Sequence, residues 1–206
     1  MTSWHQTQRL EAVHRLVLDC GARTVLDLGC GPGDLLTRLA TEPRLERIVG
    51  LDLSAEALER SRARLDSIAC PEARERAARV ELVQASMTAT GTTYRGFDCA
   101  LLVETIEHMD PERLSVLERA LFESMRPRTV VLTTPNADFN PFLEVPAHRF
   151  RHPDHRFEWG RARFARWVEG VACRNDYQAT CSTIGGRHPR YGGATQLAVF
   201  RLSGDR

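Results

Sequence analysis

Short apolar runs of strand length alternate with longer amphipathic stretches along most of this chain. The runs begin near residues 24, 48, 80, 99 and 129, and each is rich in Val, Ile and Leu. Between them, and at residues 5–19 ahead of the first run, apolar side chains recur at helical spacing. We interpret residues 5–19 as a scaffold helix. Strands that alternate with helices predict an α/β fold, in which helices cover a parallel sheet.

The last third of the chain departs from this alternation. After the fifth run, Thr129–Thr134, the stretch at about 136–161 has no periodicity and many turn-forming residues. A helix follows, and the runs Tyr177–Thr183 and Gln196–Leu202 predict two further strands, paired as an antiparallel hairpin at the sheet edge. The expected architecture is one domain over residues 1–206, with a seven-stranded sheet and an insertion at about 136–161.

Composition narrows the class of protein only a little. The chain has 28 Lys and Arg against 27 Asp and Glu, so the formal net charge of +1 does not indicate a polyanionic partner. It has no apolar run of 18 residues and no signal-peptide pattern, which argues against a membrane segment or export. The six cysteines form no CxxC pair. They are typical of reduced thiols in a cytoplasmic protein rather than of a disulfide framework.

A glycine-rich turn follows the first apolar run. Its spacing, Gly29-x-Gly31-x-Gly33, differs from the dinucleotide-binding pattern, which would place glycine where this chain has Asp34. Asp27, two residues before the first glycine, offers a carboxylate that suits a cation rather than a pyrophosphate. The stretch resembles motif I of the class I S-adenosylmethionine-dependent methyltransferases. That resemblance implies a Rossmann-like fold and S-adenosylmethionine as the cofactor.

The ends of the second and third runs carry further candidates for cofactor binding. Asp52 ends the second run, where a carboxylate can accept hydrogen bonds from both ribose hydroxyls of a nucleoside cofactor. Ser54 suits the N-cap of the following helix. Ser86 and Met87 follow the third run, where the methyltransferase fold would hold the adenine ring; a plain turn without a ligand is the alternative. The predicted cofactor residues are Asp27, Gly29, Gly31, Asp52, Ser54, Ser86 and Met87.

The fourth run, Cys99–Val103, leads into two carboxylates and an imidazole. Glu104, Glu107 and His108 stand at spacings i, i+3 and i+4, so they would share one face if the chain turns helical after the strand. Such a set at the carboxyl end of a sheet strand suits a divalent metal ion. The alternative is a solvent-facing helix start with an ordinary salt bridge.

Residues 148–161 are dense in basic and aromatic side chains. Three histidines, four arginines and three aromatic residues fall within these 14 positions. Arginines with interleaved aromatics can pair with phosphates and stack on the bases of single-stranded RNA. His188 and Tyr191, in the last loop, could also meet a ligand, although a polar surface is the simpler interpretation. The predicted RNA-binding residues are Arg149, Arg151, Arg156, Trp159 and Arg161.

Three elements together resemble the Hua-enhancer family of small-RNA 2′-O-methyltransferases, and within it the methyltransferase domain of the bacterial members. They are Glu104-x-x-Glu107-His108, Thr133-Thr134-Pro135-Asn136 and the run RHPDHRFEW from Arg151 to Trp159. The likeness extends from about Arg9 to Phe200. Two departures stand out. The family usually has Thr in place of Gly160, and Glu-Tyr in place of Asp138-Phe139.

This resemblance implies a reaction and a set of metal ligands. The family methylates the 2′-hydroxyl of the 3′-terminal nucleotide of RNA, using S-adenosylmethionine and a divalent ion, here Mg²⁺ or Mn²⁺. It implies Glu104, Glu107 and His108 as ligands, with His155 preferred over His152 as the fourth because the family ligand belongs to the Asp-His pair. His152 is then a candidate proton acceptor. Two adjacent ribose oxygens on the ion would select RNA 3′ ends over internal nucleotides and DNA.

The resemblance also implies a partner. Bacterial members pair with an RNA-repair enzyme that has kinase, phosphatase and ligase activities, and they mark RNA ends for repair. Those members carry a separate N-terminal half that activates ligation. This sequence has no counterpart of that half, so we expect an isolated catalytic domain or a shorter relative.

Other functions stay open from the sequence. A methyltransferase of the same class that acts on a small molecule would use the same glycine turn. A non-catalytic RNA-binding module with an inactive cofactor fold is disfavoured, because Asp27, Gly29, Gly31 and Asp52 are all intact. A metal-dependent hydrolase is disfavoured because it leaves the glycine turn unexplained.

Overall fold

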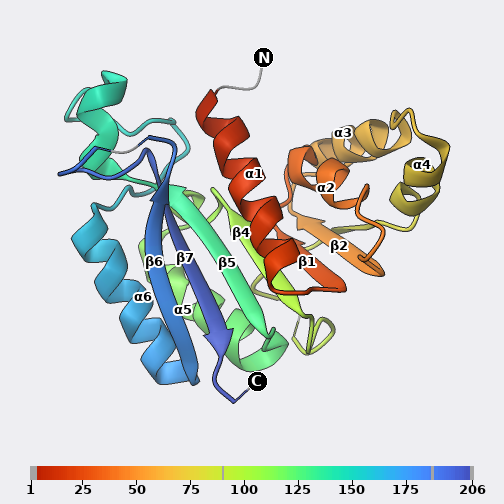
Figure 1. Cartoon of the computed structure of the whole chain (residues 1–206). Helices are drawn as coiled ribbons and strands as arrows, with labels where there is room; N and C mark the ends of the chain where they lie inside the picture. Colours follow the sequence, from red (N-terminus) through yellow and green to blue (C-terminus); the bar gives the residue numbers. More distant parts are fainter. Residues whose placement is uncertain (1–3, 90, 187, 205–206) are drawn as a thin grey trace.

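A seven-stranded sheet forms the centre of the molecule in this computed structural model, which describes residues 4–89, 91–186 and 188–204. The strand order is β3-β2-β1-β4-β5-β7-β6 (Figure 1), and β7 runs antiparallel to both of its neighbours. The remaining strand pairs are parallel. The α/β fold with an antiparallel C-terminal pair is therefore confirmed.

The strands coincide closely with the apolar runs of the sequence. The central strands β1 and β4 are almost wholly buried, because helices cover both faces of the sheet. The strands are β1 (Thr24–Leu28), β2 (Arg47–Asp52), β3 (Glu81–Gln84), β4 (Cys99–Val103), β5 (Thr129–Pro135), β6 (Tyr177–Ile184) and β7 (Thr195–Leu202).

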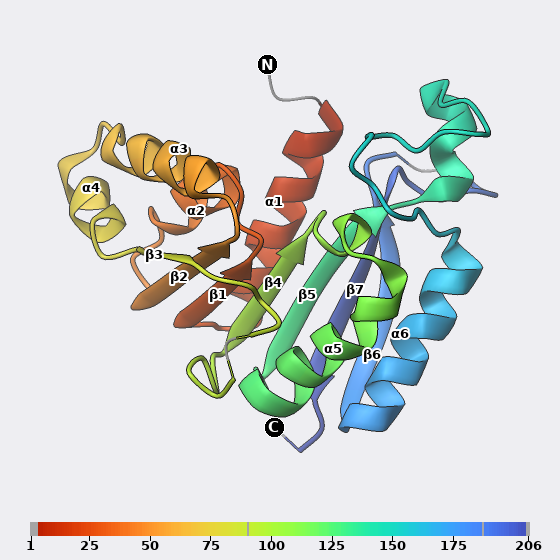
Figure 2. The same ribbon diagram turned by 180° about the vertical axis from the view of Figure 1, so that it is seen from behind.

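The helices form two layers, which Figures 1 and 2 show from opposite sides. Along β4, Leu101 belongs to the core under α1, α2 and α3, whereas Leu102 belongs to the core under α5, the π-helical η3 and α6. The helices are α1 (Trp4–Asp19), α2 (Asp34–Leu39), α3 (Ala55–Asp66), α4 (Pro71–Ala77), α5 (Leu114–Glu118), η3 (Arg119–Met125) and α6 (Arg161–Asn175). Short 3-10 segments are η1 (Ile106–His108), η2 (Pro111–Arg113) and η4 (Ala137–Leu143).

The topology brings the predicted site residues to one edge of the sheet. The carboxyl ends of the parallel strands β1, β2, β4 and β5 meet there, and ligands bind at this edge in folds of this kind. The segment 136–161 leaves β5 at the same edge and leads into α6 (Figure 1). The N-terminal end of α1 reaches this edge too. Residues far apart in the sequence can therefore build one site.

Two expectations from the sequence concern the cysteines and membrane-spanning segments. All six cysteines are free, as predicted. Within the described part of the chain, no helix is long and apolar enough to cross a membrane.

Candidate active site

The glycine turn after β1 has a conformation that requires glycine. Gly29 has φ 78°, and a Cβ there would lie 2.6 Å from the Cγ2 atom of Thr105. Gly31 has φ 54°, and a Cβ there would meet no atom within 4 Å. The first glycine lets the turn pack closely against the chain after β4. The second leaves open space, where a ligand can approach the backbone.

Asp52 fixes this turn from the end of β2. Its Oδ2 accepts a hydrogen bond from the amide of Gly31, and its Oδ1 accepts one from the amide of Ser54, both at 2.8 Å. The side chain of Ser54 caps α3 by accepting from the amide of Ala57 at 3.1 Å. Ser86 pairs with Thr88, with 2.8 Å between the hydroxyl oxygens. The side chains of Ser54 and Ser86 thus have local partners.

A cavity of about 350 Å³ opens beside the turn. It includes Gly29, Gly31, Asp52 and Met87 of the predicted cofactor residues and does not include Asp27, Ser54 or Ser86. At its other end it reaches two of the predicted metal ligands. The lining residues are Gly29, Gly31, Leu51, Asp52, Leu53, Ala85, Met87, Glu104, Thr105, His108 and Met109. One space therefore joins the glycine turn to Glu104 and His108, two members of what we call the acidic and histidine cluster (Glu104, Glu107, His108, His152 and His155).

Asp27 lies beneath the cavity rather than in its wall. Its side chain is 2% exposed, and burial, together with the charge of Asp52, raises the pKa of its carboxyl to about 7. A buried carboxyl with this pKa is only partly ionised near neutrality. A cation bound nearby would favour its charged form.

The chain after β4 does not form the α-helix on which the predicted shared face depended. Glu104 has φ 52°, and only Ile106–His108 form a single turn of 3-10 helix. The positive φ turns the chain sharply at the strand end, so Glu104 stands outside the helical turn that carries Glu107 and His108. The prediction that these residues share one helix face was wrong. The turn instead places Glu104 and Glu107 near enough for their charges to interact.

Two threonines at the end of β5 hold the two carboxylates of the cluster. Thr133 Oγ1 donates to Glu104 Oε1 at 3.1 Å, and Thr134 Oγ1 donates to Glu107 Oε2 at 3.0 Å. Both threonines are fully buried. The two threonines of the Thr-Thr-Pro-Asn element thus support the carboxylates. They can reach them because β5 lies next to β4 in the sheet.

The carboxylates are short of positive charge. Glu107 is fully buried, and its Oε1 has no hydrogen-bond partner. Burial and then the neighbouring Glu104 raise the pKa of Glu107 well above its usual range. Burial also raises the pKa of Glu104, although Arg9 lies 3.3 Å from its Oε2 and opposes the shift. An unpartnered buried carboxylate oxygen of this kind fits a cation.

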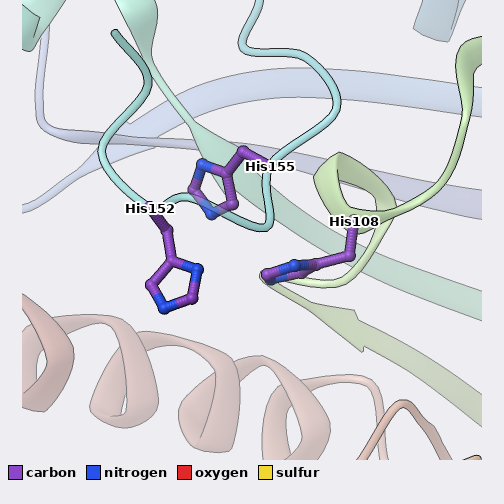
Figure 3. Close-up of side chains that lie close together, drawn as sticks. All are labelled: His108, His152 and His155. Atoms are coloured by element: carbon purple, nitrogen blue, oxygen red, sulfur yellow. The ribbon is translucent and has the colours of Figure 1, made fainter.

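Three histidines stand together beside these carboxylates. Nitrogen atoms of His108, His152 and His155 lie within 4.8 Å of one another, and Figure 3 shows the rings gathered there from η1 and from the 136–161 segment. Burial, and then the other two imidazoles, lower the pKa of His108. A neutral imidazole is the form that binds a metal. Neither Glu104 nor Glu107 belongs to this tight group.

The surroundings of His155 and His152 differ. His155 is buried, and its Nδ1 lies 2.6 Å from Oε1 of Glu158. A carboxylate can only accept, so Nδ1 carries the proton, and the neutral imidazole then has its lone pair on Nε2, as in carboxylate–histidine–metal arrangements. The side chain of His152 is 55% exposed and accepts a hydrogen bond from the amide of Asp154. These surroundings support His155 as the buried ligand and leave His152 nearer to solvent.

Two of the predicted RNA-binding side chains have internal roles instead. Trp159 is 5% exposed and stacks on Phe157, with 4.4 Å between ring centroids, so it cannot stack on a base. Arg151 donates to the Asn140 side chain at 2.6 Å, to the Ala194 carbonyl at 2.7 Å and to the Asn136 carbonyl. Its guanidinium fastens the 136–161 segment to the sheet. We therefore correct the role of both residues.

The other three predicted RNA-binding residues lie at the surface. Arg149 is exposed, and Arg156 is 61% exposed with Asp110 3.9 Å from its Nε. Arg161 is 44% exposed, lies 3.6 Å from Asp138 and donates to the carbonyl of Arg190. Exposed ion pairs of this length contribute little to stability, so these guanidiniums can exchange their partners for phosphates.

The two departures from the family pattern are neighbours in space. Asp138 Oδ2 accepts a hydrogen bond at 3.0 Å from the amide of Arg161, the first residue of α6, which Gly160 cannot cap with a side chain. A Cβ at position 160 would stand 2.5 Å from Oδ1 of Asp138. Asp138 therefore occupies the space, and takes the capping role, that Thr at position 160 would have.

The comparisons with known proteins agree with this geometry. The methyltransferase-domain family matches residues 25–128. The solved methyltransferase domain of the bacterial protein CtHen1 is 36% identical, with a TM-score of 0.82 over 95% of this chain and 98% of that one. The solved small RNA methyltransferase HEN1 is 29% identical, with a TM-score of 0.88 over 98% of this chain and 26% of that one.

A curated relative from Xenopus tropicalis, described as a small RNA 2′-O-methyltransferase, is 35% identical over 94% of this chain and 53% of its own length. The chain spans about half the length of the first curated relatives it matches. With the fold and cavity described above, the chain belongs to the methyltransferase-domain family and has the fold of the S-adenosylmethionine-dependent enzymes. Within that class it belongs to the Hen1 family of small-RNA 2′-O-methyltransferases.

The sequence did not mark four residues that contact the predicted metal ligands: Arg9, Thr133, Thr134 and Glu158. Arg9 lies on α1, which we interpreted as scaffold, and nothing in its local pattern marks it. Thr133, Thr134 and Glu158 stand inside motifs that carried the resemblance, so position alone could have marked them as supports of the metal ligands.

Proposed function

We propose that this chain transfers a methyl group from S-adenosylmethionine to the 2′-hydroxyl of the 3′-terminal nucleotide of RNA, with the help of a divalent ion. One observation carries the proposal. A single cavity joins Gly29, Gly31 and Asp52, which suit the cofactor, to Glu104 and His108 of the acidic and histidine cluster. The methyl donor and a hydroxyl held at the cluster would then face each other across that space.

The donor set fits Mg²⁺ or Mn²⁺, with the imidazoles favouring Mn²⁺. The residues that would hold the ion are Glu104, Glu107, His108 and His155. When bound, a divalent ion lowers the pKa of a coordinated hydroxyl and so makes it a better nucleophile. Thr133 and Thr134 orient the carboxylates, and Glu158 orients His155. These supports keep the ligand atoms in place before substrate binds.

Proton removal is assigned to His152. Its imidazole lies with those of His108 and His155 but is 55% exposed, so it can pass an accepted proton to water. To accept that proton, its Nδ1 must first give up the hydrogen bond from the amide of Asp154. His155 is less suited to this role. Its side chain is buried, and its Nδ1 is hydrogen-bonded to Glu158. The enzyme otherwise contributes positioning and electrostatics, since methyl transfer needs the hydroxyl oxygen in line with the sulfonium methyl group.

RNA would approach over the exposed arginines. Arg149 and Arg156 flank the histidines in the 136–161 segment, and Arg161 starts α6 directly after it. In the sequence their positive charge lies on either side of His152 and His155, although the whole chain is nearly neutral, and such a local concentration favours a polyanion.

The test uses S-adenosylmethionine with a labelled methyl group, Mn²⁺ and three RNAs of one sequence. These end in a 2′,3′-diol, in a 2′-deoxy sugar or in a 3′-deoxy sugar. We expect label only on the diol-ended RNA, because both hydroxyls of the terminal ribose would be needed to hold it at Glu104, Glu107, His108 and His155 through the ion. Equal labelling of the diol and 3′-deoxy ends would exclude chelation. Equal labelling of the diol and 2′-deoxy ends would exclude the proposed target atom.

The proposed partner and cellular location rest on the resemblance to bacterial members of the Hen1 family. We infer that the chain works in the bacterial cytoplasm with an RNA-repair enzyme that has kinase, phosphatase and ligase activities. A solved Pnkp1/Rnl/Hen1 RNA repair complex contains a chain that shares the fold at 19% identity. Co-purification of the repair enzyme with the tagged protein from its native cells tests this association.

A further inference from the structure

A group of aromatic rings lies outside the cavity and is not used by the proposed reaction. Phe142 of η4 stands 4.8 Å from His188 and 5.3 Å from Tyr191, measured between ring centroids, and His188 and Tyr191 are themselves 4.8 Å apart. We refer to Phe142, His188 and Tyr191 as the aromatic platform. It joins η4 to the connection between β6 and β7, and these two segments lie side by side in both Figures 1 and 2.

The platform is open to solvent rather than a small core of its own. Phe142 is 49% exposed, and His188 and Tyr191 are only half-buried. A phenylalanine recruited only to pack two loops together would be expected to lie deeper. An exposed ring whose neighbours are also aromatic can receive a further planar group on its free face.

Positive charge borders the platform. The guanidinium of Arg190 lies 5.2 Å from the centre of the Tyr191 ring. Arg161 donates to the carbonyl of Arg190, so a second guanidinium stands beside the same loop. Asp138 is the carboxylate that pairs with Arg161, at 3.6 Å, and that pair is more than 40% exposed on both sides. Rings bordered by two arginines match a ligand that has both bases and phosphates.

Direct contacts connect the platform to the active site. Asn136, at the end of β5, donates to the carbonyls of Tyr191 and Gly193, both at 2.8 Å. On the other side, Phe142 lies 5.2 Å from Phe139, which lies 6.4 Å from His5 of α1. One helical turn further along α1, Arg9 reaches Glu104 at 3.3 Å. A series of side-chain contacts through α1 thus links the platform to Glu104.

We propose that the aromatic platform binds the bases of single-stranded nucleotides that precede the 3′-terminal nucleotide. This inference rests on the proposed function, because it takes the terminal ribose to sit at the acidic and histidine cluster. Bases stack on Phe142 and Tyr191, while Arg190 and Arg161 pair with the phosphates between them. Stacking on a ring face does not depend on the identity of the base, so this contact adds affinity without sequence preference.

The test measures how the affinity for RNA depends on RNA length and on the aromatic rings of the platform. We would measure binding of 5′-fluorescein single-stranded RNAs of one, two, three and six nucleotides, each with a 2′,3′-diol, by fluorescence anisotropy. The variants are Phe142→Leu and Tyr191→Leu, which keep an apolar side chain, and Phe142→Tyr and Tyr191→Phe, which keep the ring. Arg60→Ala, an exposed arginine on α3, is the control for general loss of charge. S-adenosylmethionine binding by every variant checks that the cofactor turn stays folded.

We expect the native chain to gain affinity once the RNA reaches the platform. Each leucine variant should lose five- to a hundredfold in affinity for the hexamer and bind the mononucleotide as the native chain does. The ring-keeping variants and Arg60→Ala should bind every length normally. Equal hexamer binding by the leucine variants would overturn the inference, as would equal losses for Phe142→Leu and Phe142→Tyr.

Two further outcomes separate this inference from the proposed function. If the leucine variants bind RNA normally but change the oligomeric state in solution, the platform is a protein contact and the inference fails. If the native chain binds the hexamer through the platform but transfers no methyl group to it, the proposed reaction fails and the platform stands. If methyl transfer to RNA occurs and the leucine variants bind the hexamer as tightly as the native chain, only the platform fails.

Discussion

His155 and Glu158 are joined by a contact of 2.6 Å between Nδ1 and Oε1, and both side chains are almost fully buried. Burial opposes ionisation of Glu158, but hydrogen bonds from His155, Asn140 and the amide of Arg151, together with the charge of Arg151, outweigh it and lower the pKa of Glu158. The carboxylate therefore stays charged and fixes both the orientation and the tautomer of His155. Glu158 is a positioning residue in this account.

The first prediction concerns this contact. Glu158→Gln keeps the shape of the side chain but removes its charge, so His155 becomes a weaker ligand. We expect the affinity for Mn²⁺ to fall ten- to a hundredfold in calorimetric titration. Glu169→Gln, an exposed glutamate of α6, is the matched control and should change nothing. Unchanged Mn²⁺ affinity in Glu158→Gln would contradict the positioning role of Glu158.

The second prediction concerns the threonine that holds Glu107. Thr134→Val keeps the size of the side chain but leaves both carboxylate oxygens of Glu107 without a side-chain hydroxyl donor. The pKa of Glu107 should rise further, and a proton then competes with the ion. We expect a ten- to hundredfold loss of Mn²⁺ affinity that grows as the pH falls. Thr180→Val on β6, an exposed edge position, should bind Mn²⁺ normally. A loss that did not depend on pH would contradict this explanation.

The sheet and the cofactor turn were predictable, whereas the assembly of the site was not. Apolar runs bounded by turn formers mark β1, β2 and β4, because a buried parallel strand must be apolar on both faces. The positive φ at Glu104 has no comparable signal, since glutamate rarely adopts that conformation. The density of arginines and aromatic residues in 148–161 brought Trp159 and Arg151 forward as RNA contacts, but composition does not distinguish a residue that touches substrate from one that supports the segment.

The third prediction concerns the pH dependence of stability. Burial raises the pKa of Asp27 to about 7 in the folded chain, above its ordinary value of 3.8. Between these values the folded state holds a proton that the unfolded state has released, so stability falls as the pH rises. A shift of this size corresponds to about 4 kcal/mol at most. Asp27→Asn should therefore flatten the decline between pH 5 and pH 7.5 in urea unfolding. An equal decline in both proteins would contradict the burial of a titrating Asp27.

The fourth prediction tests the coupling of Asp138 and Gly160. Asp138→Ala removes the cap of α6 and should cost about 1 kcal/mol of unfolding free energy. Gly160→Thr alone places a Cβ against Asp138 and should also destabilise. The double variant supplies its own cap in the vacated space, so it should be more stable than either single variant. Urea unfolding of all four proteins measures this double-mutant cycle. Additive losses would mean that the two positions are independent.

The acidic and histidine cluster is proposed to act through a divalent ion at the RNA 3′ end. The most direct measurement is methyl transfer to diol-ended RNA, first in EDTA and then as Mn²⁺ is returned, for the native chain and for Glu107→Gln. We expect no transfer in EDTA, full recovery with Mn²⁺, and a need for at least tenfold more Mn²⁺ in Glu107→Gln. Methyl transfer at the full rate in EDTA would contradict the proposed requirement for a divalent ion.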